Sequence, residues 1–353
     1  MNVDHTLASL DELRRFDAII DARSPSEFAH DHIPGAINCP VLDDEERARV
    51  GTLYKQVSPF EARKVGAALV AINVARHLQN VFQQQPKGWT PLVYCWRGGQ
   101  RSGAFTHILR QVGWSAQRLN GGYKAWRSFV LTELEHIPAS FQFQVISGPT
   151  GCAKTKILHA LSQLGEQVLD LEGLAAHKGS VLGELPRTVQ PSQKMFDTML
   201  LETLSRMDPN RPVYVEAESK RIGSIQLPDS LFQAMNRSPW LSIQASLQAR
   251  VDFLLTDYDY WFDNPDLAVQ LDRLMPLCGN EQVTQWKTLI TERQFPELVG
   301  ELLTKHYDHF YKRSMRHIQT DTDTGRIFNA EDLSPSSIAT LAERIAQRTS
   351  SGA

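Results

Sequence analysis

Several features that mark special classes of protein are missing from these 353 residues. Only four cysteines occur, without a CxxC pair, so the chain has neither a disulfide framework nor a zinc-finger spacing. The longest apolar stretch, residues 67–75, is far shorter than the roughly 20 residues of a membrane span. The N-terminus also lacks the basic-then-apolar order of a signal peptide. We therefore expect a cytoplasmic protein with reduced thiols.

A large excess of one sign of charge is also missing, because the chain has 37 basic and 40 acidic side chains and a net charge of −3. This balance argues against a uniformly basic nucleic-acid coat, but it allows a local basic surface. With 42% hydrophobic and 22% charged residues, the composition excludes disordered and collagen-like chains. It indicates a soluble protein of one to three domains.

Short apolar runs, glycine-rich turns and helical patterns alternate in two successive segments, which is typical of α/β domains with parallel sheets. A polar stretch at residues 135–141, which contains Pro138, predicts the boundary between them. Beyond about residue 249 strand signals disappear, so a helical extension is expected. A helix is also expected from Ser102. The predicted strands are residues 18–21, 91–94, 141–145, 168–171, 213–215 and 241–245.

The loop YCWRGGQRSG, residues 94–103, places a cysteine directly after an apolar strand and before a helix. Backbone N–H groups of such a loop, together with a helix N-terminus, bind tetrahedral anions and favour the thiolate form of a central cysteine. A small buried residue at a strand end is the alternative interpretation. The catalytic candidates are Cys95, Arg97 and Arg101, and the other anion-binding candidates are Trp96, Gly98, Gly99 and Gln100.

Three stretches in order resemble the rhodanese family: DARSPSEFAHDHIPGAINCP at residues 21–40, the cysteine loop, and LNGGYKAW at residues 119–126. The resemblance covers about the first third of the chain. It implies that Cys95 carries sulfur or selenium as a persulfide or selenopersulfide, while the loop amides and arginines hold an anionic donor. Asp21 and Arg23 are interpreted as a structural ion pair.

The spacing of Cys95 and Arg101, with five residues between them, also resembles rhodanese-like phosphatases, in which the arginine holds phosphate oxygens. A phosphatase is therefore an alternative for this domain. A loop of this length would equally suit a donor that is a phosphate analogue, such as selenophosphate.

The segment GPTGCAKT follows a predicted strand and opens a helix, as a Walker A phosphate loop does. Lys154 supplies a point charge and Thr155 is a candidate Mg²⁺ ligand. Ala153 replaces the usual second glycine, which fits if its φ is negative and which argues against ordinary nucleotide turnover. A glycine turn without a ligand is the alternative, and Cys152 is interpreted as a small filler. The predicted diphosphate-binding residues are Gly148, Thr150, Gly151, Cys152, Ala153, Lys154 and Thr155.

Glu216 and Glu218 end a predicted strand, where a carboxylate of a phosphate-loop protein orients water or a metal, although both side chains would also suit solvent. Arg250 is a candidate phosphate contact, but a solvated arginine at a helix start is the favoured interpretation.

Large aromatic side chains usually belong to a core, yet three are candidates for an apolar slot. These are Trp240, Trp261 and Phe262.

With DLEGLAAHKGSVLG at residues 170–183 and VEAESKRIGSIQLP at residues 215–228, the chain resembles the tRNA 2-selenouridine synthase family along essentially its whole length. The resemblance implies an enzyme that geranylates the sulfur of wobble 2-thiouridine in tRNA with geranyl diphosphate. Selenium from selenophosphate then replaces the S-geranyl group through Cys95. The implied parts are a rhodanese-like domain at residues 1–136, a P-loop α/β domain at 141–250 and a helical C-terminal extension at 251–353.

The expected partners are tRNA, selenophosphate and geranyl diphosphate, with a selenophosphate-producing enzyme as a candidate and no membrane. No tightly bound cofactor is expected, and Mg²⁺ is a candidate. Basic residues interleaved with aromatics are candidates for tRNA contact, namely Lys305, Lys312, Arg313 and Arg316. The aromatics Tyr307, Phe310 and Tyr311 are interpreted as the core face of a helix.

Two other functions stay open at this point. One is a rhodanese-like sulfurtransferase or phosphatase fused to an ATPase. The other is a catalytically silent tRNA-binding scaffold, against which the presence of Cys95 and Lys154 argues.

Overall fold

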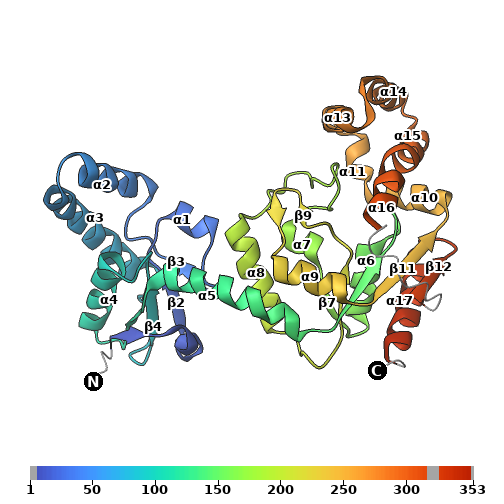
Figure 1. The fold of residues 1–353 in the computed structure, drawn as a ribbon. Coiled ribbons are helices and arrows are strands. Elements are labelled where there is room, and N and C mark those ends of the chain that lie inside the picture. Colours follow the sequence, from blue (N-terminus) through green and yellow to red (C-terminus); the bar gives the residue numbers. More distant parts are fainter. Residues whose placement is uncertain (1–5, 316–325, 351–353) are drawn as a thin grey trace. The chain divides into compact units, whose positions relative to one another are not determined.

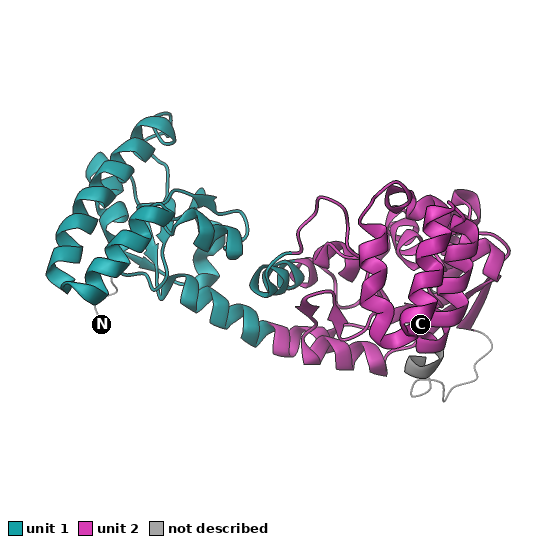
Figure 2. Ribbon diagram, turned by 90° about the horizontal axis from the view of Figure 1, so that it is seen from above, with its two compact units in different colours: residues 1–133, 191–202 teal, residues 134–190, 203–353 magenta. Residues whose placement is uncertain are grey.

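The computed structural model describes residues 6–315 and 326–350. The chain divides into two compact units, residues 1–133 with 191–202 and residues 134–190 with 203–353 (Figure 2). The return of residues 191–202 to the first unit was not predicted from the sequence. Across the described ranges, no helix has both the length and the apolar character needed to cross a membrane.

The first unit is built on a parallel sheet of five strands in the order β1-β5-β4-β2-β3. All four residues of β4 are buried, as is typical of a central strand in a parallel sheet. The strands are β1 (Leu7–Ala8), β2 (Ala18–Asp21), β3 (Ile37–Asn38), β4 (Pro91–Tyr94) and β5 (Gln117–Leu119). The helices are α1 (Pro25–His30), α2 (Asp44–Gln56), α3 (Pro59–Asn80), α4 (Gln100–Val112) and α5 (Gly122–His136).

The second unit contains another parallel five-stranded sheet, in the order β12-β11-β6-β8-β7 (Figure 1). Strands that follow β6 lie on both sides of it, and ligand crevices form at the carboxyl end of such a switch point. A short antiparallel ribbon, β9 (Arg221–Ile222) with β10 (Ile225–Gln226), stands apart from this sheet. The sheet strands are β6 (Phe143–Ser147), β7 (Gln167–Leu169), β8 (Val213–Glu216), β11 (Trp240–Ala245) and β12 (Ile327–Ala330).

Helices make up most of the rest of the second unit, and α8 begins in the first unit. The helices up to β11 are α6 (Lys154–Gln163), α7 (Leu171–Ala175), α8 (Gln193–Ser205) and α9 (Asp229–Arg237). Those after β11 are α10 (Leu247–Asp257), α11 (Asp259–Phe262), α12 (Leu267–Leu271), α13 (Met275–Cys278), α14 (Asn280–Thr291), α15 (Phe295–Leu302), α16 (Asp308–Met315) and α17 (Pro335–Ser350).

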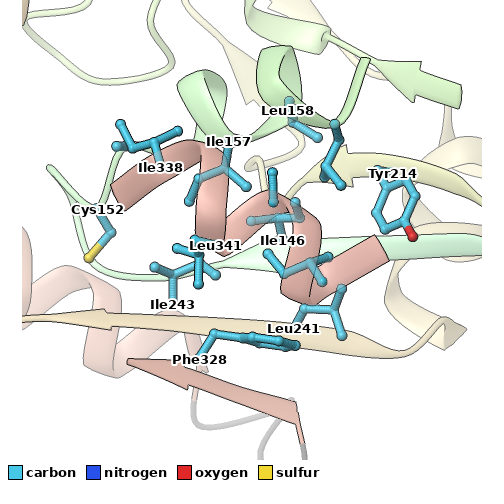
Figure 3. Packing of buried hydrophobic residues seen from close by; sticks show 14 of the residues in the cluster. Ile146, Cys152, Ile157, Leu158, Tyr214, Leu241, Ile243, Phe328, Ile338 and Leu341 are labelled. Carbon is cyan, nitrogen blue, oxygen red and sulfur yellow. The ribbon is translucent and has the colours of Figure 1, made fainter. Parts of the chain in front are cut away.

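Strand β12 corrects the expectation that strands end before residue 249. It pairs in parallel with β11 at the sheet edge, and only its Phe328 is buried. Four residues with one buried position give no clear alternation, so the pattern was not recognised. Helix α17 follows, and its Ile338 and Leu341 pack with Phe328, Ile157 of α6 and Ile243 of β11 (Figure 3). The end of the chain thus completes the core of this unit.

Candidate active sites

Cys95 lies at the carboxyl end of β4, where the chain turns into α4. The residue is buried, and its Sγ lies 3.2 Å from Oγ of Ser102 in the first turn of α4. An open pocket of about 420 Å³ is lined by Cys95, Trp96, Arg97, Gly99, Gln100 and Arg101. The structure therefore brings together all predicted residues of this loop except Gly98, which does not line the pocket.

Gly98 instead allows the backbone of residues 119–126, the third rhodanese-like stretch, to pack closely against the cysteine loop. Its φ is +65°, and a Cβ there would lie 2.6 Å from the Leu119 carbonyl oxygen. A Cβ on Gly122 would collide with the Cys95 carbonyl oxygen and the Gly98 nitrogen. Across this close approach the N–H of Tyr123 donates to the Cys95 carbonyl oxygen over 2.8 Å. The turn that begins α5 therefore holds the backbone of the cysteine loop in place through this hydrogen bond and close packing.

Arg101 lines the pocket while it is also held by a carboxylate. Its Nη1 lies 2.7 Å from Oε2 of Glu27 in α1. Burial opposes ionisation of Glu27, but the paired Arg101 holds the pKa of that carboxyl below its usual value. Lys194 of α8 adds a cation that was not predicted, with Nζ 5.8 Å from the centroid of the Trp96 ring.

Asp21 and Arg23 form the structural ion pair that was predicted. Both side chains are buried, and Nη2 of Arg23 lies 2.6 Å from Oδ2 of Asp21. The guanidinium also lies over the Tyr123 ring, 3.9 Å from its centroid. The pair does not line the cysteine pocket, which is consistent with a role in the fold.

The phosphate loop connects β6 to α6, and its backbone corrects one expectation. Ala153 has φ +55° rather than a negative value. The loop turns sharply just before α6, so the residue before Lys154 adopts the left-handed conformation, which costs a residue with a Cβ about 1–2 kcal/mol. Gly151, at φ +86°, packs so closely that a Cβ would lie 2.9 Å from Leu254 Cδ1. Cys152 is fully buried in the core, as the filler interpretation expects (Figure 3).

Thr155 faces two carboxyl groups. Its Oγ1 lies 2.9 Å from Oε2 of Glu172 and 3.0 Å from Oε2 of Glu216. One hydroxyl proton serves only one of these oxygens, so the arrangement suits a proton or a cation between them. Glu172 was not singled out in the sequence, although it follows a predicted strand in the stretch at residues 170–183.

Burial dominates the protonation of this carboxyl cluster. Glu216 is fully buried, so the solvent-facing interpretation is wrong for it. Burial, and then the neighbouring Glu172, raise the pKa of Glu216 well above its usual value and that of Glu218 to about 8. Burial and the mutual repulsion of these carboxyl groups therefore favour their protonated forms. Among the described residues, no set of three or more His, Cys, Asp or Glu side chains is arranged to hold a metal ion.

The phosphate loop opens onto a cavity of about 640 Å³. This volume lies within the roughly 300–1,000 Å³ of small-molecule sites. Lys154, Thr155 and Glu218 all line it, and so does Lys178, which was not predicted. Nζ of Lys178 lies 2.6 Å from Oδ2 of Asp257. The side of the cavity with lysines beside a glycine-rich loop is suited to bind a diphosphate.

Arg250 is buried, which corrects the solvated interpretation. Its Nη1 and Nη2 lie 2.7 Å and 2.8 Å from the two carboxylate oxygens of Asp308, and Nη1 donates to the Thr150 carbonyl oxygen over 3.2 Å. The side chain does not line the cavity, so it braces the phosphate loop against α16. Trp240, Trp261 and Phe262 do not line the cavity. Trp261 is buried in a separate core against which Phe262 packs, which confirms the favoured core interpretation for these two residues.

The aromatics near residue 310 do not form a simple core face. Tyr307, Phe310 and Tyr311 line the cavity, and Phe310 remains 41% exposed. A π-helical turn at Leu303–Tyr307 shifts the helical register before α16, so a period of 3.6 assigns the faces incorrectly. Lys305 pairs with Glu301 at 2.9 Å. The side chains of Lys312 and Arg313, and the whole of Arg316, lie outside the described residues.

Comparison with known proteins assigns both units. The family described as "Rhodanese-like domain" matches residues 6–129, and the one described as "tRNA 2-selenouridine synthase AAA domain" matches residues 141–265. Relatives with the name tRNA 2-selenouridine synthase match as well, and three of them illustrate the similarity. The relative from Nitrosomonas europaea is 38% identical over 68% of this chain and 63% of its own, and that from Alcanivorax borkumensis is 39% identical over 68% and 66%. The relative from Marinobacter nauticus is 32% identical over 83% of this chain and 87% of its own.

The match thus spans just under two thirds of the length of the first two relatives and most of the third. With the third relative the match reaches 32% identity over 87% of that relative's length. The chain belongs to the tRNA 2-selenouridine synthase family.

Proposed function

We propose that this protein is an enzyme that converts wobble 2-thiouridine of tRNA into 2-selenouridine in two steps. A geranyl group is first attached to the sulfur from geranyl diphosphate, and selenium from selenophosphate then replaces the S-geranyl group. One observation carries the proposal: the chain has a candidate anion-binding loop on each of its two units, and Cys95 lies in the pocket of the first. Cys152 of the second loop is fully buried in the core, and burial raises the pKa of its thiol.

The first step suits the phosphate loop. The sulfur of the base attacks the first carbon of the geranyl group, and diphosphate leaves. Lys154 and the amides at the start of α6 stabilise the negative charge that develops on the leaving diphosphate. Mg²⁺ is part of the proposal, since Thr155, one or two of the nearby carboxylates and diphosphate oxygens are the oxygen ligands that it takes.

The second step suits the cysteine loop. Arg97 and the loop amides bind the anionic selenophosphate, and the Cys95 thiolate attacks its phosphorus. The P–Se bond breaks and hydrogen selenide is released, while water hydrolyses the resulting cysteine thiophosphate to phosphate and free Cys95. The selenide then attacks C2 of the alkylated base. Sulfur on the base is a poor leaving group until it is alkylated, so geranylation prepares its departure as geranylthiol. The tRNA that carries S-geranyl-2-thiouridine, the product of the first step, is then the substrate of the second.

Two substitutions separate the steps. We expect Cys95→Ala to abolish selenation of thiolated tRNA and to leave geranylation intact. We expect Lys154→Ala to slow geranylation by roughly a hundredfold, as loss of a charge-stabilising group typically does. The products are measured by mass spectrometry of nucleosides, and Lys55→Ala, on the exposed face of α2, is the control for loss of a lysine.

The proposal has clear contradicting outcomes. Selenation by Cys95→Ala at the wild-type rate would remove the proposed role of this cysteine. ATP hydrolysis that is independent of tRNA and lost in Lys154→Ala would favour a sulfurtransferase or phosphatase fused to an ATPase.

A further inference from the structure

The cavity at the phosphate loop has two walls of different chemistry. Its polar wall comes from the phosphate loop, α7 and the segment after β8, including Lys154, Glu172 and Glu218. The second wall comes from helical segments that follow β11 in the chain, among them α10, α13 and α16, which are labelled in Figure 1. That wall contributes the apolar or aromatic side chains Phe253, Leu254, Leu277, Tyr307, Phe310 and Tyr311.

Two members of this wall leave much apolar surface uncovered. Leu277 of α13 is 52% exposed and Phe310 of α16 is 41% exposed, although both border a cavity. Side chains behind them are packed, since Leu254 is buried in a hydrophobic cluster that Tyr307 joins. A supported wall with uncovered apolar groups beside a cavity is typical of a binding surface.

The titratable side chains described along this wall are neutral or paired. His306 is buried, and its ring centroid lies 4.7 Å from that of Tyr307 and 4.9 Å from that of Phe310. Burial lowers the pKa of His306, so its ring is neutral at neutral pH. Asp257, which borders the cavity, is paired with Lys156 at 3.2 Å and Lys178 at 2.6 Å. A hydrocarbon group that contacts this wall therefore leaves no unpaired charge of these residues without water.

We propose that this wall binds the hydrocarbon chain of a prenyl diphosphate whose diphosphate lies on the phosphate loop. The identity of the chain as geranyl rests on the proposed function. A single cavity then holds both ends of the donor, with the loop binding its charge and Leu277 and Phe310 covering its chain. Contact with apolar surface favours binding in proportion to the area removed from water.

Binding measurements test this inference without requiring any reaction. The dissociation constants of inorganic diphosphate, geranyl diphosphate and ATP are measured by calorimetry on the full-length protein and on the double variant Leu277→Ser/Phe310→Ser. Wild-type protein is expected to bind geranyl diphosphate at least about tenfold more tightly than inorganic diphosphate. The double variant should lose this preference, while its affinity for inorganic diphosphate changes less than about twofold.

A matched control is Val269→Ser, since Val269 is 63% exposed on α12 and does not line the cavity. Equal affinity of wild-type protein for the two diphosphates would overturn the inference, and so would a geranyl preference that survives the double substitution. Preferential binding of ATP that the double variant loses would identify the wall as a nucleobase site and overturn it as well. If the preference behaves as expected but no geranyl-tRNA forms, the proposed function fails and this binding site remains.

Discussion

At the scale of single residues, the carboxyl groups beside Thr155 determine how the phosphate cavity responds to pH. The pKa of Glu218 rises to about 8 in the folded protein because its half-buried side chain is partly removed from water and faces Glu172. The folded state therefore binds more protons than the unfolded state between about pH 4.5 and pH 8, and stability falls as the pH rises through this range. Above pH 8 the charged carboxylate destabilises the fold most.

We expect Glu218→Gln to stabilise the protein at high pH, because glutamine keeps the shape and removes the buried charge. The gain should be about 1–2 kcal/mol at pH 9, a fraction of the roughly 1.4 kcal/mol per pKa unit that a fully buried group would give. At pH 5 it should nearly vanish. Melting temperatures at both pH values measure this, with Glu343→Gln on the exposed face of α17 as control. A gain that is equal at both pH values would contradict the explanation.

Residues with a local motif were predictable from the sequence, whereas residues placed by tertiary contacts were not. Cys95, Lys154 and Thr155 stand at fixed offsets in loops whose backbone geometry depends on neighbouring residues. Lys194, in contrast, reaches the cysteine loop only because residues 191–202 return to the first unit. Asp308, which forms an ion pair with the buried Arg250, is likewise distant from it in sequence. The sequence therefore placed this arginine in solvent, whereas the structure places it in a buried ion pair.

At the scale of elements, the turn that begins α5 supports the cysteine loop. The N–H groups of Tyr123 and Lys124 donate to the carbonyl oxygens of Cys95 and Trp96 over 2.8 Å and 2.9 Å. These contacts need a glycine at position 122, where φ is +59° and no space remains for a Cβ. This explains why the NGG stretch accompanies the cysteine loop in the sequence.

We expect Gly122→Ala to cost about 3 kcal/mol of stability, because its Cβ meets backbone atoms that cannot move without deforming the loop. Selenation should fall in parallel. Gly113→Ala is the matched control, since Gly113 also has a positive φ, +107°, but has open space around it. That variant should lose only the roughly 1–2 kcal/mol of backbone strain. Thermal unfolding and selenation assays measure both, and equal losses would contradict the steric explanation.

Elements with strong periodicity were predicted within a few residues, and weak or irregular ones were not. The runs at residues 18–21 and 91–94 became β2 and β4 because they are central, buried strands. The edge strand β12 and the π-helical turn at Leu303–Tyr307 escaped recognition. The first is too short to alternate, and the second breaks the regular helical period that pattern analysis assumes.

At the scale of the whole molecule, the proposed function assigns its two steps to two different pockets. The phosphate cavity belongs to the second unit and the cysteine pocket to the first. In the proposed function the two sites share an intermediate, S-geranyl-2-thiouridine in tRNA. The order of the steps follows from chemistry, because sulfur leaves the base readily only after alkylation.

The most direct test of this account is mass spectrometry of tRNA nucleosides during stepwise incubation with wild-type protein. Thiolated tRNA is incubated first with geranyl diphosphate alone, and selenophosphate is added after the donor has been removed. We predict that S-geranyl-2-thiouridine accumulates in the first stage and is converted into 2-selenouridine in the second. Formation of 2-selenouridine from thiolated tRNA and selenophosphate without any geranyl donor would contradict the central claim.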